Sequence, residues 1–173
     1  MSKKRNDLIE HAERLFYENG FHAVGLKRVL KEANVSLMTM YNHFDSKEAL
    51  ILETLKKREN RYFSLLRETA AENKESCALS LAEAHFKWIR SYRKGCMFLR
   101  AKEEFPSAEN EINKYAVAHK KLLISFFEEH HFNYPEATRL AILFEGATAL
   151  SEVLDLEAVY SELMFTIQNL FEK

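Results

Sequence analysis

Apolar residues recur along this chain at intervals of three and four positions, which is the spacing of one face of an α-helix. The stripes predict four helices in the first part of the chain, roughly at residues 5–18, 26–33, 37–44 and 48–70. Five further stripes follow, at residues 81–92, 96–105, 112–127, 140–150 and 156–170. Strand-like alternation does not persist over a useful length. The pattern therefore predicts an all-α fold of about nine helices.

The second and third stripes are short and meet at a tight corner, Asn34-Val35-Ser36. Two helices joined in this way are the layout of a DNA-reading helix-turn-helix. One apolar arc of the third helix is expected to face the core, and it comprises Leu37, Met40, Tyr41 and Phe44. The opposite side is expected to be exposed, and it carries Met38, Thr39, Asn42 and His43.

The exposed side of the third helix has side chains that can reach base edges. Asn42 can pair bidentately with adenine, Thr39 offers a hydroxyl and a methyl group, and Met38 can touch a thymine methyl group. The same spacing also occurs in ordinary helical proteins, in which Tyr41 only packs against the first helix and Thr39 only bonds to the backbone. Asn42 and Met38 have no evident structural duty, and sequence specificity is therefore expected on this face.

Capping residues mark where two of these helices begin. Ser36 is a good N-cap for the third helix. Asp45 followed by Glu48 resembles a capping box that starts a long fourth helix. This helix would connect a helix-turn-helix DNA-binding domain at residues 1–50 to a helical ligand-binding and dimerisation domain at residues 51–173.

Charge is distributed unevenly, although the 173 residues have a formal net charge of only −1. Residues 1–58 carry eleven basic and eight acidic side chains, a net charge of +3, whereas residues 59–173 carry fourteen basic and eighteen acidic side chains, a net charge of −4. Only the first part suits a polyanion such as DNA. The asymmetry is modest, but it coincides with the helix-turn-helix.

The composition argues against several classes of protein. No run of about 18 apolar residues occurs, so we expect no membrane span. The charged start of the chain argues against a secretory signal, and a cytoplasmic location is expected. Cys77 and Cys96 lack CxxC spacing, so we expect reduced thiols instead of a disulfide or a zinc site. Catalytic and nucleotide-binding motifs do not occur, and we expect neither an enzyme nor a cofactor.

Several short runs occur together near the start of the chain. They are a Gly-Phe corner at residues 20–21, Val35-Ser36, the run from Thr39 to Phe44 and the run from Ser46 to Leu50. Through these runs the first 55 or so residues resemble a TetR/AcrR-type transcriptional regulator. Residues 95–105 are similar to a segment of one branch of that family. The resemblance implies a homodimer that binds a palindromic operator and a C-terminal domain that binds a small molecule, which releases the DNA.

The resemblance also implies that Thr39, Tyr41, Asn42, His43 and Lys47 contact DNA. With Met38 on the exposed face and Lys27 on the preceding helix, the DNA-binding set that we expect comprises Lys27, Met38, Thr39, Tyr41, Asn42, His43 and Lys47. Tyr41 and Lys47 would contact phosphates, with Lys47 at a helix start where backbone N–H groups also attract anions. This chain has Gly25, Asn34 and Leu37-Met38 where the family often has Thr or Ser, Gly and Lys-Gly. Because Met38 is bulkier than glycine, no operator sequence can be carried over.

Aromatic and polar side chains of the second part suggest a pocket for an effector. The candidates are Phe63, His85, Trp88, Tyr92, Phe98, Glu104 and His119. An apolar pocket with a few convergent polar groups is the usual form of a small-molecule site. The alternative is that these residues only fill the core, and no effector can be named. His130-His131 lies at a helix end, where a solvated loop is expected instead of a metal site.

The last two helices carry wide apolar stripes with small residues, such as Gly146 and Ala147, that permit close approach. A second copy of the chain would cover them and would place two reading helices about 34–36 Å apart. Burial within a monomer is the alternative. The leading hypothesis is thus a dimeric, ligand-responsive regulator, more a repressor than an activator. The runner-up is a helical ligand-binding or protein-interaction module that has lost DNA recognition, as Leu37 and Met38 would permit.

Overall fold

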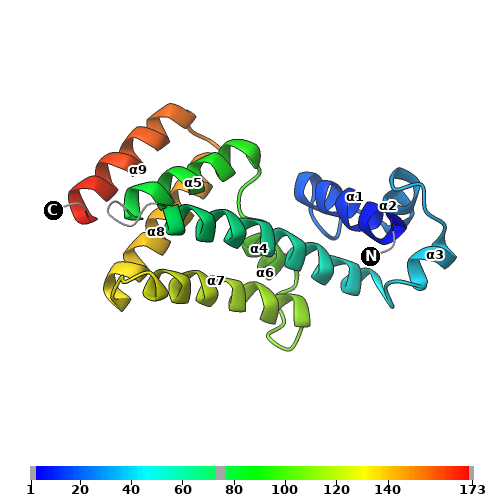
Figure 1. The fold of residues 1–173 in the computed structure, drawn as a ribbon. Coiled ribbons are helices and arrows are strands. Elements are labelled where there is room, and N and C mark those ends of the chain that lie inside the picture. The colour runs from blue at the N-terminus through cyan, green and yellow to red at the C-terminus, as the bar shows by residue number, and fades with distance from the viewer. Residues whose placement is uncertain (1–2, 73–76, 172–173) are drawn as a thin grey trace. The chain divides into compact units, whose positions relative to one another are not determined.

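The structure is a computed structural model that describes residues 3–72 and 77–171, and these residues form nine α-helices and no strand (Figure 1). The helices are α1 (Lys3–Asn19), α2 (Leu26–Glu32), α3 (Leu37–Tyr41), α4 (Lys47–Glu72), α5 (Cys77–Ser91), α6 (Met97–Glu104), α7 (Glu111–Glu129), α8 (Tyr134–Leu150) and α9 (Leu156–Phe171). The predicted all-α fold is confirmed.

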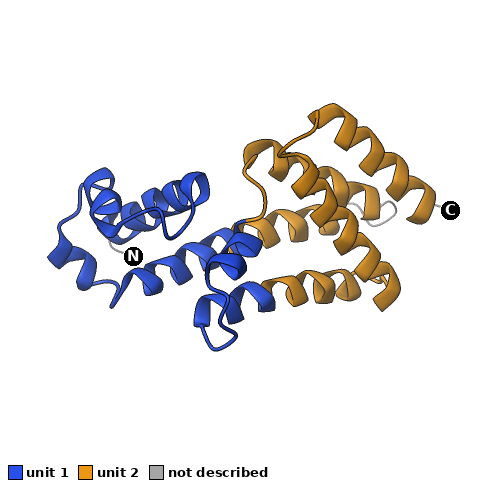
Figure 2. Cartoon of the chain, turned by 180° about the vertical axis from the view of Figure 1, so that it is seen from behind, with its two compact units in different colours: residues 1–59, 97–118 blue, residues 60–96, 119–173 orange. Residues whose placement is uncertain are grey.

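The chain divides into two compact units, each made of two separate segments (Figure 2). Unit 1 comprises Met1–Glu59 and Met97–Ala118, and unit 2 comprises Asn60–Cys96 and His119–Lys173. Helices α4 and α7 each contribute residues to both units. The predicted boundary after residue 50 separates a DNA-binding domain from a ligand-binding domain by function, and it stays a prediction. The compact units divide elsewhere because α6 and the first part of α7 bond to the N-terminal helices.

Two hydrogen bonds illustrate why late segments belong to unit 1. Arg100 of α6 donates to the carbonyl oxygen of Tyr17 at 2.6 Å. The Tyr115 hydroxyl of α7 donates to a carboxylate oxygen of Glu59 at 2.6 Å. Each bond joins residues far apart in the sequence, so a local sequence pattern cannot predict it.

Helix α1 is tied to α4 by two ion pairs within unit 1. Arg58 lies 3.0 Å from Glu13, and both side chains are almost fully buried. Arg5 lies 2.5 Å from Glu53, and its guanidinium carbon lies 5.1 Å from the centre of the Phe44 ring. Arg5 is therefore a structural residue of α1, whereas the neighbouring Lys3 and Lys4 are exposed.

The interior of unit 2 is built from aromatic and branched side chains. Helix α5 packs against α8 and α9, and α8 packs against α9. The largest fully buried side chains in this core are Phe63, Phe86, Phe127 and Phe144. Burying aromatic side chains of this size supplies a large part of the folding free energy. Helix α8 starts with a complete capping box between Asn133 and Glu136.

The observed caps agree with the sequence at α3 and differ at α4. The Ser36 hydroxyl oxygen accepts from the Thr39 N–H at 3.1 Å, as predicted. The predicted Asp45 and Glu48 capping box is wrong, because the hydroxyl oxygen of Ser46 accepts from the Ala49 N–H at 3.0 Å. A serine one position nearer to the first helical turn thus takes the role assigned to the aspartate.

The predicted buried arc of α3 is only half correct. Met40 and Phe44 are buried, but Leu37 is 50% exposed and Tyr41 is 52% exposed. Helix α3 has only five residues, and Phe44 lies beyond its end. A helix of little more than one turn presents a narrow face to the core, so a wheel drawn through residue 44 overestimates how much it buries.

Candidate nucleic-acid interface and effector site

The turn between α2 and α3 presents the reading helix to solvent. Asn34 has a φ of 50°, in the left-handed region that asparagine tolerates better than most residues. Val35 is buried and anchors the turn, and Ser36 caps the helix that follows. Asparagine therefore serves in place of the glycine that is common at this turn.

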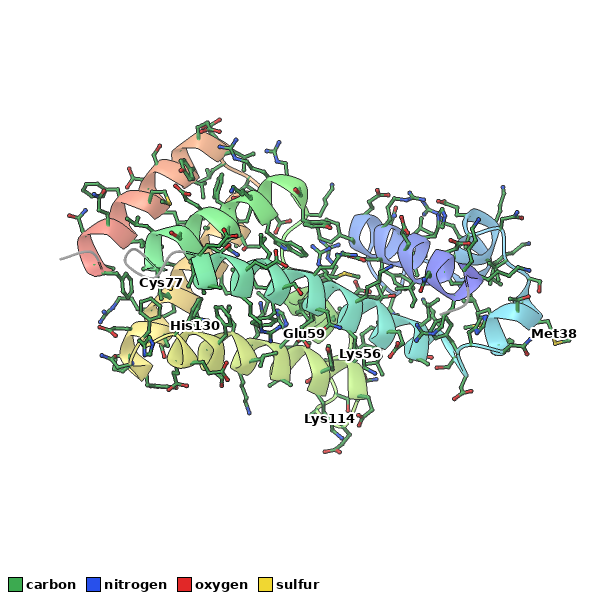
Figure 3. All side chains as sticks on the ribbon, viewed as in Figure 1. Met38, Lys56, Glu59, Cys77, Lys114 and His130 are labelled. Carbon is green, nitrogen blue, oxygen red and sulfur yellow. The ribbon has the colours of Figure 1, made fainter. Side chains whose placement is uncertain are left out.

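The surface around α3 is mostly uncharged and strongly exposed. Met38 is 74% exposed and lies at the tip of α3, pointing away from the rest of the ribbon (Figure 3). Tyr41 and Asn42 are also exposed, whereas Thr39 and His43 are half-buried. The predicted base-facing side chains are thus gathered on one short helix and the turn after it.

Thr39 has a local hydrogen-bond partner as well. Its hydroxyl lies 2.9 Å from the hydroxyl of Ser36. This contact helps to fix the Thr39 side chain, and it differs from the bond to a backbone carbonyl that the sequence suggested as an alternative. The role of Thr39 toward DNA stays a prediction.

The cations next to α3 are not equally available to a phosphate. Lys27 is exposed on α2. Arg28 and Arg14 both pair with Glu32, and the hydrogen bond from Arg14 lowers the pKa of this carboxyl group below its usual value. Lys27 is therefore better placed than Arg28 to bind an anion.

Lys47 is committed to the protein in this structure. Its ammonium donates to the carbonyl oxygen of Phe21 at 2.7 Å and lies 5.8 Å from the centre of the Phe16 ring. Burial lowers the pKa of Lys47. The predicted phosphate contact stays a prediction. It would have to use the N–H donors of the Lys47 ammonium that do not bond to the Phe21 carbonyl oxygen.

Glu104 has a role that the sequence did not indicate. Its carboxylate accepts from the backbone N–H of Phe21 at 3.0 Å and from that of His22 at 2.6 Å. Its carbonyl oxygen lies 2.7 Å from Nε2 of His22. Glu104 of α6 therefore holds the corner between α1 and α2 in unit 1. Its carboxylate has hydrogen-bond partners within the protein, so an effector is not needed to explain a glutamate at this position.

The predicted effector residues divide between the two units. Five of them belong to unit 2, namely Phe63, His85, Trp88, Tyr92 and His119. Phe98 and Glu104 belong to unit 1, where Phe98 is buried. The sequence therefore grouped residues that do not share one compact unit.

His85 is the polar centre of the unit 2 interior. Its Nδ1 lies 2.8 Å from the Tyr62 hydroxyl, and its Nε2 lies 2.9 Å from the Phe144 carbonyl oxygen and 3.1 Å from the Thr148 hydroxyl. The ring stacks on Phe144 with centroids 4.3 Å apart. Burial lowers the pKa of His85 to about 4, so the ring is neutral at pH 7.

Further polar side chains of unit 2 were missed by the sequence reasoning. The ammonium of Lys120 lies 2.5 Å from Oε1 of Glu145 and 3.1 Å from Sγ of Cys96. Burial alone would lower the pKa of Lys120, but the nearby Cys96 and Glu145 raise it above its usual value. Burial, then Glu145 and Cys96, raise the pKa of Tyr62.

We name these four residues, Tyr62, Cys96, Lys120 and Glu145, the polar cluster. Among the described residues, Oε2 of Glu145 is buried without a hydrogen-bond partner. Three of the cluster residues lie on different helices and Cys96 lies just before α6, so their approach depends on tertiary packing. The one signal in the sequence was that Lys120 and Tyr62 are neighbours of the predicted His119 and Phe63.

An apolar groove lies along α8 and α9, with a volume of about 420 Å³. Its lining includes Ile142, Gly146, Leu150, Leu154 and Leu163. Exposed apolar side chains continue on the same helices and the turn between them, and they comprise Ile142, Leu150, Val153, Leu154, Phe165 and Leu170. Helices α8 and α9 and the turn between them therefore carry large apolar side chains that the rest of unit 2 does not cover.

The described part of the chain offers neither a metal-binding cluster nor a membrane-spanning helix. Residues 3–72 and 77–171 contain no group of three His, Cys, Asp or Glu side chains that could hold a metal ion. His130 instead bonds through Nδ1 to the carbonyl oxygen of Phe126 at 2.7 Å. None of the described helices is long and apolar enough to span a membrane.

Residues 8–54 match the family model for bacterial regulatory proteins of the tetR family. The chain is 38% identical over 64 residues to the HTH-type transcriptional regulator UidR of Escherichia coli strain K12, and the match covers 37% of this chain and 33% of UidR. The matched part thus spans about a third of that relative's length.

Two solved structures extend the similarity to almost the whole chain. The TetR-family transcriptional regulator SCO4454 of Streptomyces coelicolor has a TM-score of 0.90 at 26% identity, covering 96% of this chain and 93% of that one. A cysteine mutant of the TetR-family regulator CifR, solved with 26-base-pair operator DNA, has a TM-score of 0.80 at 15% identity, covering 98% and 97% of the two chains. All three proteins are regulators of transcription.

Proposed function

Because this chain belongs to the tetR family of bacterial regulatory proteins, we propose that it is a repressor that binds operator DNA as a homodimer and leaves it when a small molecule binds unit 2. The observation that carries the DNA-binding part is the exposed face of α3. This face exposes the side chains of Met38, Tyr41 and Asn42. The cap at Ser36 and the turn before it fix the position of the helix.

DNA binding is supported by two kinds of side chain around α3, one suited to bases and one suited to phosphates. Met38 and Asn42 have side chains suited to base edges, and Tyr41 can donate to a phosphate oxygen. Lys27 supplies an exposed cation on the neighbouring helix. Contacts to phosphates hold the protein in register, and contacts to bases select the sequence.

A homodimer is supported by the apolar surface of α8 and α9. Ile142 is 65% exposed and Phe165 is 64% exposed, although both are large apolar residues. Gly146 lines the groove together with Ile142, and no atom lies within 4 Å of the position that a Cβ would take there. A second copy related by a twofold axis would cover this surface and would supply the two half-site readers that a palindrome requires.

An effector site within unit 2 is supported by the polar cluster and the aromatic side chains around it. Tyr62 and Trp88 have ring centroids 5.2 Å apart. Glu145 Oε2, which lacks a partner among the described residues, could accept a hydrogen bond from a ligand. Apolar walls with a few directed polar groups are the chemistry of a small-molecule site.

The test is selection of bound fragments from random DNA, followed by titration of the selected fragment at several salt concentrations. We expect a twofold-symmetric sequence and an affinity that falls steeply with salt. Tyr41→Phe combined with Lys27→Ala should weaken binding, and Lys121→Ala on α7 is the control. If no DNA sequence is enriched, or if the affinity does not depend on salt concentration, the result would instead favour a helical module that has lost DNA recognition. Transcription from a template with the selected site then reports the sign of regulation.

A further inference from the structure

Cys96 has a cation beside its sulfur. The Lys120 ammonium lies 3.1 Å from Sγ of Cys96 and is held on its other side by Glu145, 2.5 Å away. The raised pKa of Lys120 keeps it charged at neutral pH. An ammonium held in this position directs an N–H donor at the sulfur, the atom that acts as a nucleophile when a cysteine is modified.

Cys96 is only partly buried. An ammonium has three N–H donors, and the described contacts of Lys120 are with Sγ of Cys96 and with Glu145. A further donor therefore remains for an atom of a bound molecule. The aromatic rings of Tyr62 and Trp88 offer apolar surface in the same unit.

We propose that Cys96 is a modification site and that the effector is a small α,β-unsaturated carbonyl compound. This inference rests on the proposed function, because it names the chemical class of the unit 2 effector. The sulfur attacks the β-carbon, so an S–C bond forms while the C=C π bond breaks. The electron pair moves onto the carbonyl oxygen, to which Lys120 donates a hydrogen bond. The thiol's proton ends on the α-carbon, and no oxidant or reductant is consumed.

The position of Cys96 in the chain links modification to unit 1. Gly95 has a φ of 68°, and a Cβ at this position would collide with the carboxylate of Glu152. The left-handed backbone before Cys96 therefore favours glycine at residue 95. The backbone after it begins α6, whose residue Glu104 holds the corner between α1 and α2. A group attached to Cys96 should disturb the start of α6 and weaken DNA binding.

The test compares the two cysteines of the full-length protein by peptide mass spectrometry after treatment with 2-cyclohexen-1-one. Cys77, at the start of α5, is also partly buried and serves as the internal control (Figure 3). We expect Cys96 to react about tenfold faster than Cys77. Lys120→Met should slow the reaction of Cys96 about tenfold, and Lys120→Arg should restore part of the rate. Circular dichroism checks that each variant is folded.

A second reagent separates the two roles of Lys120. Iodoacetamide alkylates a thiol without forming an enolate, so Lys120→Met should slow it less than it slows the enone. Equal rates at Cys96 and Cys77, or a rate at Cys96 that ignores Lys120→Met, would overturn the inference.

DNA affinity, measured before and after enone treatment, decides whether the modification regulates. We expect treatment to weaken DNA binding by the unmodified sequence and by Cys77→Ser, but not by Cys96→Ser. A selective adduct without loss of affinity would disprove regulation through Cys96 while leaving the proposed DNA-binding function intact. If the untreated protein bound no DNA, the proposed function would be wrong. The reaction rates of Cys96 and Cys77 would still test whether Cys96 is a modification site.

Discussion

At the scale of single residues, Met38 and His85 are two of the side chains whose exposure or burial contradicts their usual preference. Met38 is an apolar side chain that is 74% exposed. His85 is an ionisable side chain that is buried. Residues that violate the usual preference often serve a function, and each therefore carries a prediction.

Met38→Ala should reduce affinity for the selected operator about fivefold to tenfold, because it removes an apolar contact worth about 1 kcal/mol with a base. Binding to random competitor DNA should change little. Lys27→Ala is the contrasting variant, since loss of a phosphate contact weakens binding to all sequences and reduces the salt slope by about one. Fluorescence anisotropy of labelled DNA at several salt concentrations measures both. A uniform loss for Met38→Ala would rule out base reading.

Unit 2 should lose stability as the pH falls from 6.5 toward 4. The pKa of His85 is about 4 in the folded chain, below its ordinary value of 6.5. Between these values the unfolded chain binds more protons, so stability is present above pH 6.5 and is lost as the pH falls. The full effect is about 3 kcal/mol. Urea unfolding followed by Trp88, the one tryptophan in the chain, reports on this unit.

The matching variant is His85→Gln, which can keep hydrogen bonds but does not titrate in this range. Its free energy of unfolding should depend less on pH between 4 and 6.5. If the slopes of the two proteins are the same, His85 is not the titrating group.

At the scale of elements, short helices are positioned by hydrogen bonds from distant ones. Helix α3 has five residues and cannot hold its own place. The corner between α1 and α2 is fixed by Glu104 of α6 and by Lys47 at the start of α4. The presentation of the reading helix therefore depends on segments that follow it in the chain.

Gly20→Ala and Glu104→Ala should both weaken this corner. Gly20 has a φ of 90°, and a Cβ there would lie 2.8 Å from Oε1 of Glu104. We expect Gly20→Ala to destabilise unit 1 by about 1–2 kcal/mol. Glu104→Ala removes hydrogen bonds to two N–H groups and should cost about 1–2 kcal/mol. Amide hydrogen exchange at Phe21 and His22 measures the loss, with Glu103→Ala as the control. Unchanged protection in Glu104→Ala would contradict the role assigned to α6.

At the scale of the whole molecule, neither compact unit is one continuous stretch of chain. Unit 1 takes in α6 and the first part of α7, and unit 2 takes in residues on both sides of them. The chain therefore passes from unit 1 to unit 2, back to unit 1 and again to unit 2. The exposed apolar surface of α8 and α9 lies wholly within unit 2, so a dimer formed there would join copies through that unit.

Phe165→Glu combined with Ile142→Glu should shift the protein toward a monomer. A charge buried in an apolar interface without a partner costs several kcal/mol. Sedimentation velocity measures the oligomeric state, and the affinity for a full palindrome should fall with it. Leu122→Glu on α7, where leucine is 37% exposed, is the matched control. A double variant that stayed dimeric would exclude this surface as the interface.

Local features of the sequence determined the helices and the reading motif. Periodic apolar residues marked the nine helices that residues 3–72 and 77–171 form, and Asn34 and Ser36 identified the turn and the cap of α3. These features are local, because helix formation and capping depend on residues within a few positions of one another. The exposed side of α3 was predicted only in part, because Met38 and Asn42 are exposed whereas Thr39 and His43 are half-buried.

Contacts between distant residues were decided only by the tertiary structure. The polar cluster forms from residues 62, 96, 120 and 145, and Glu104 bonds to residues more than 80 positions earlier. Their partners depend on how helices pack, so spacing along the chain carries no signal for them. The sequence alone thus determined the helical elements and the class of DNA-reading motif. Packing decided which charges are paired, where a thiol meets a cation and how the reading helix is held.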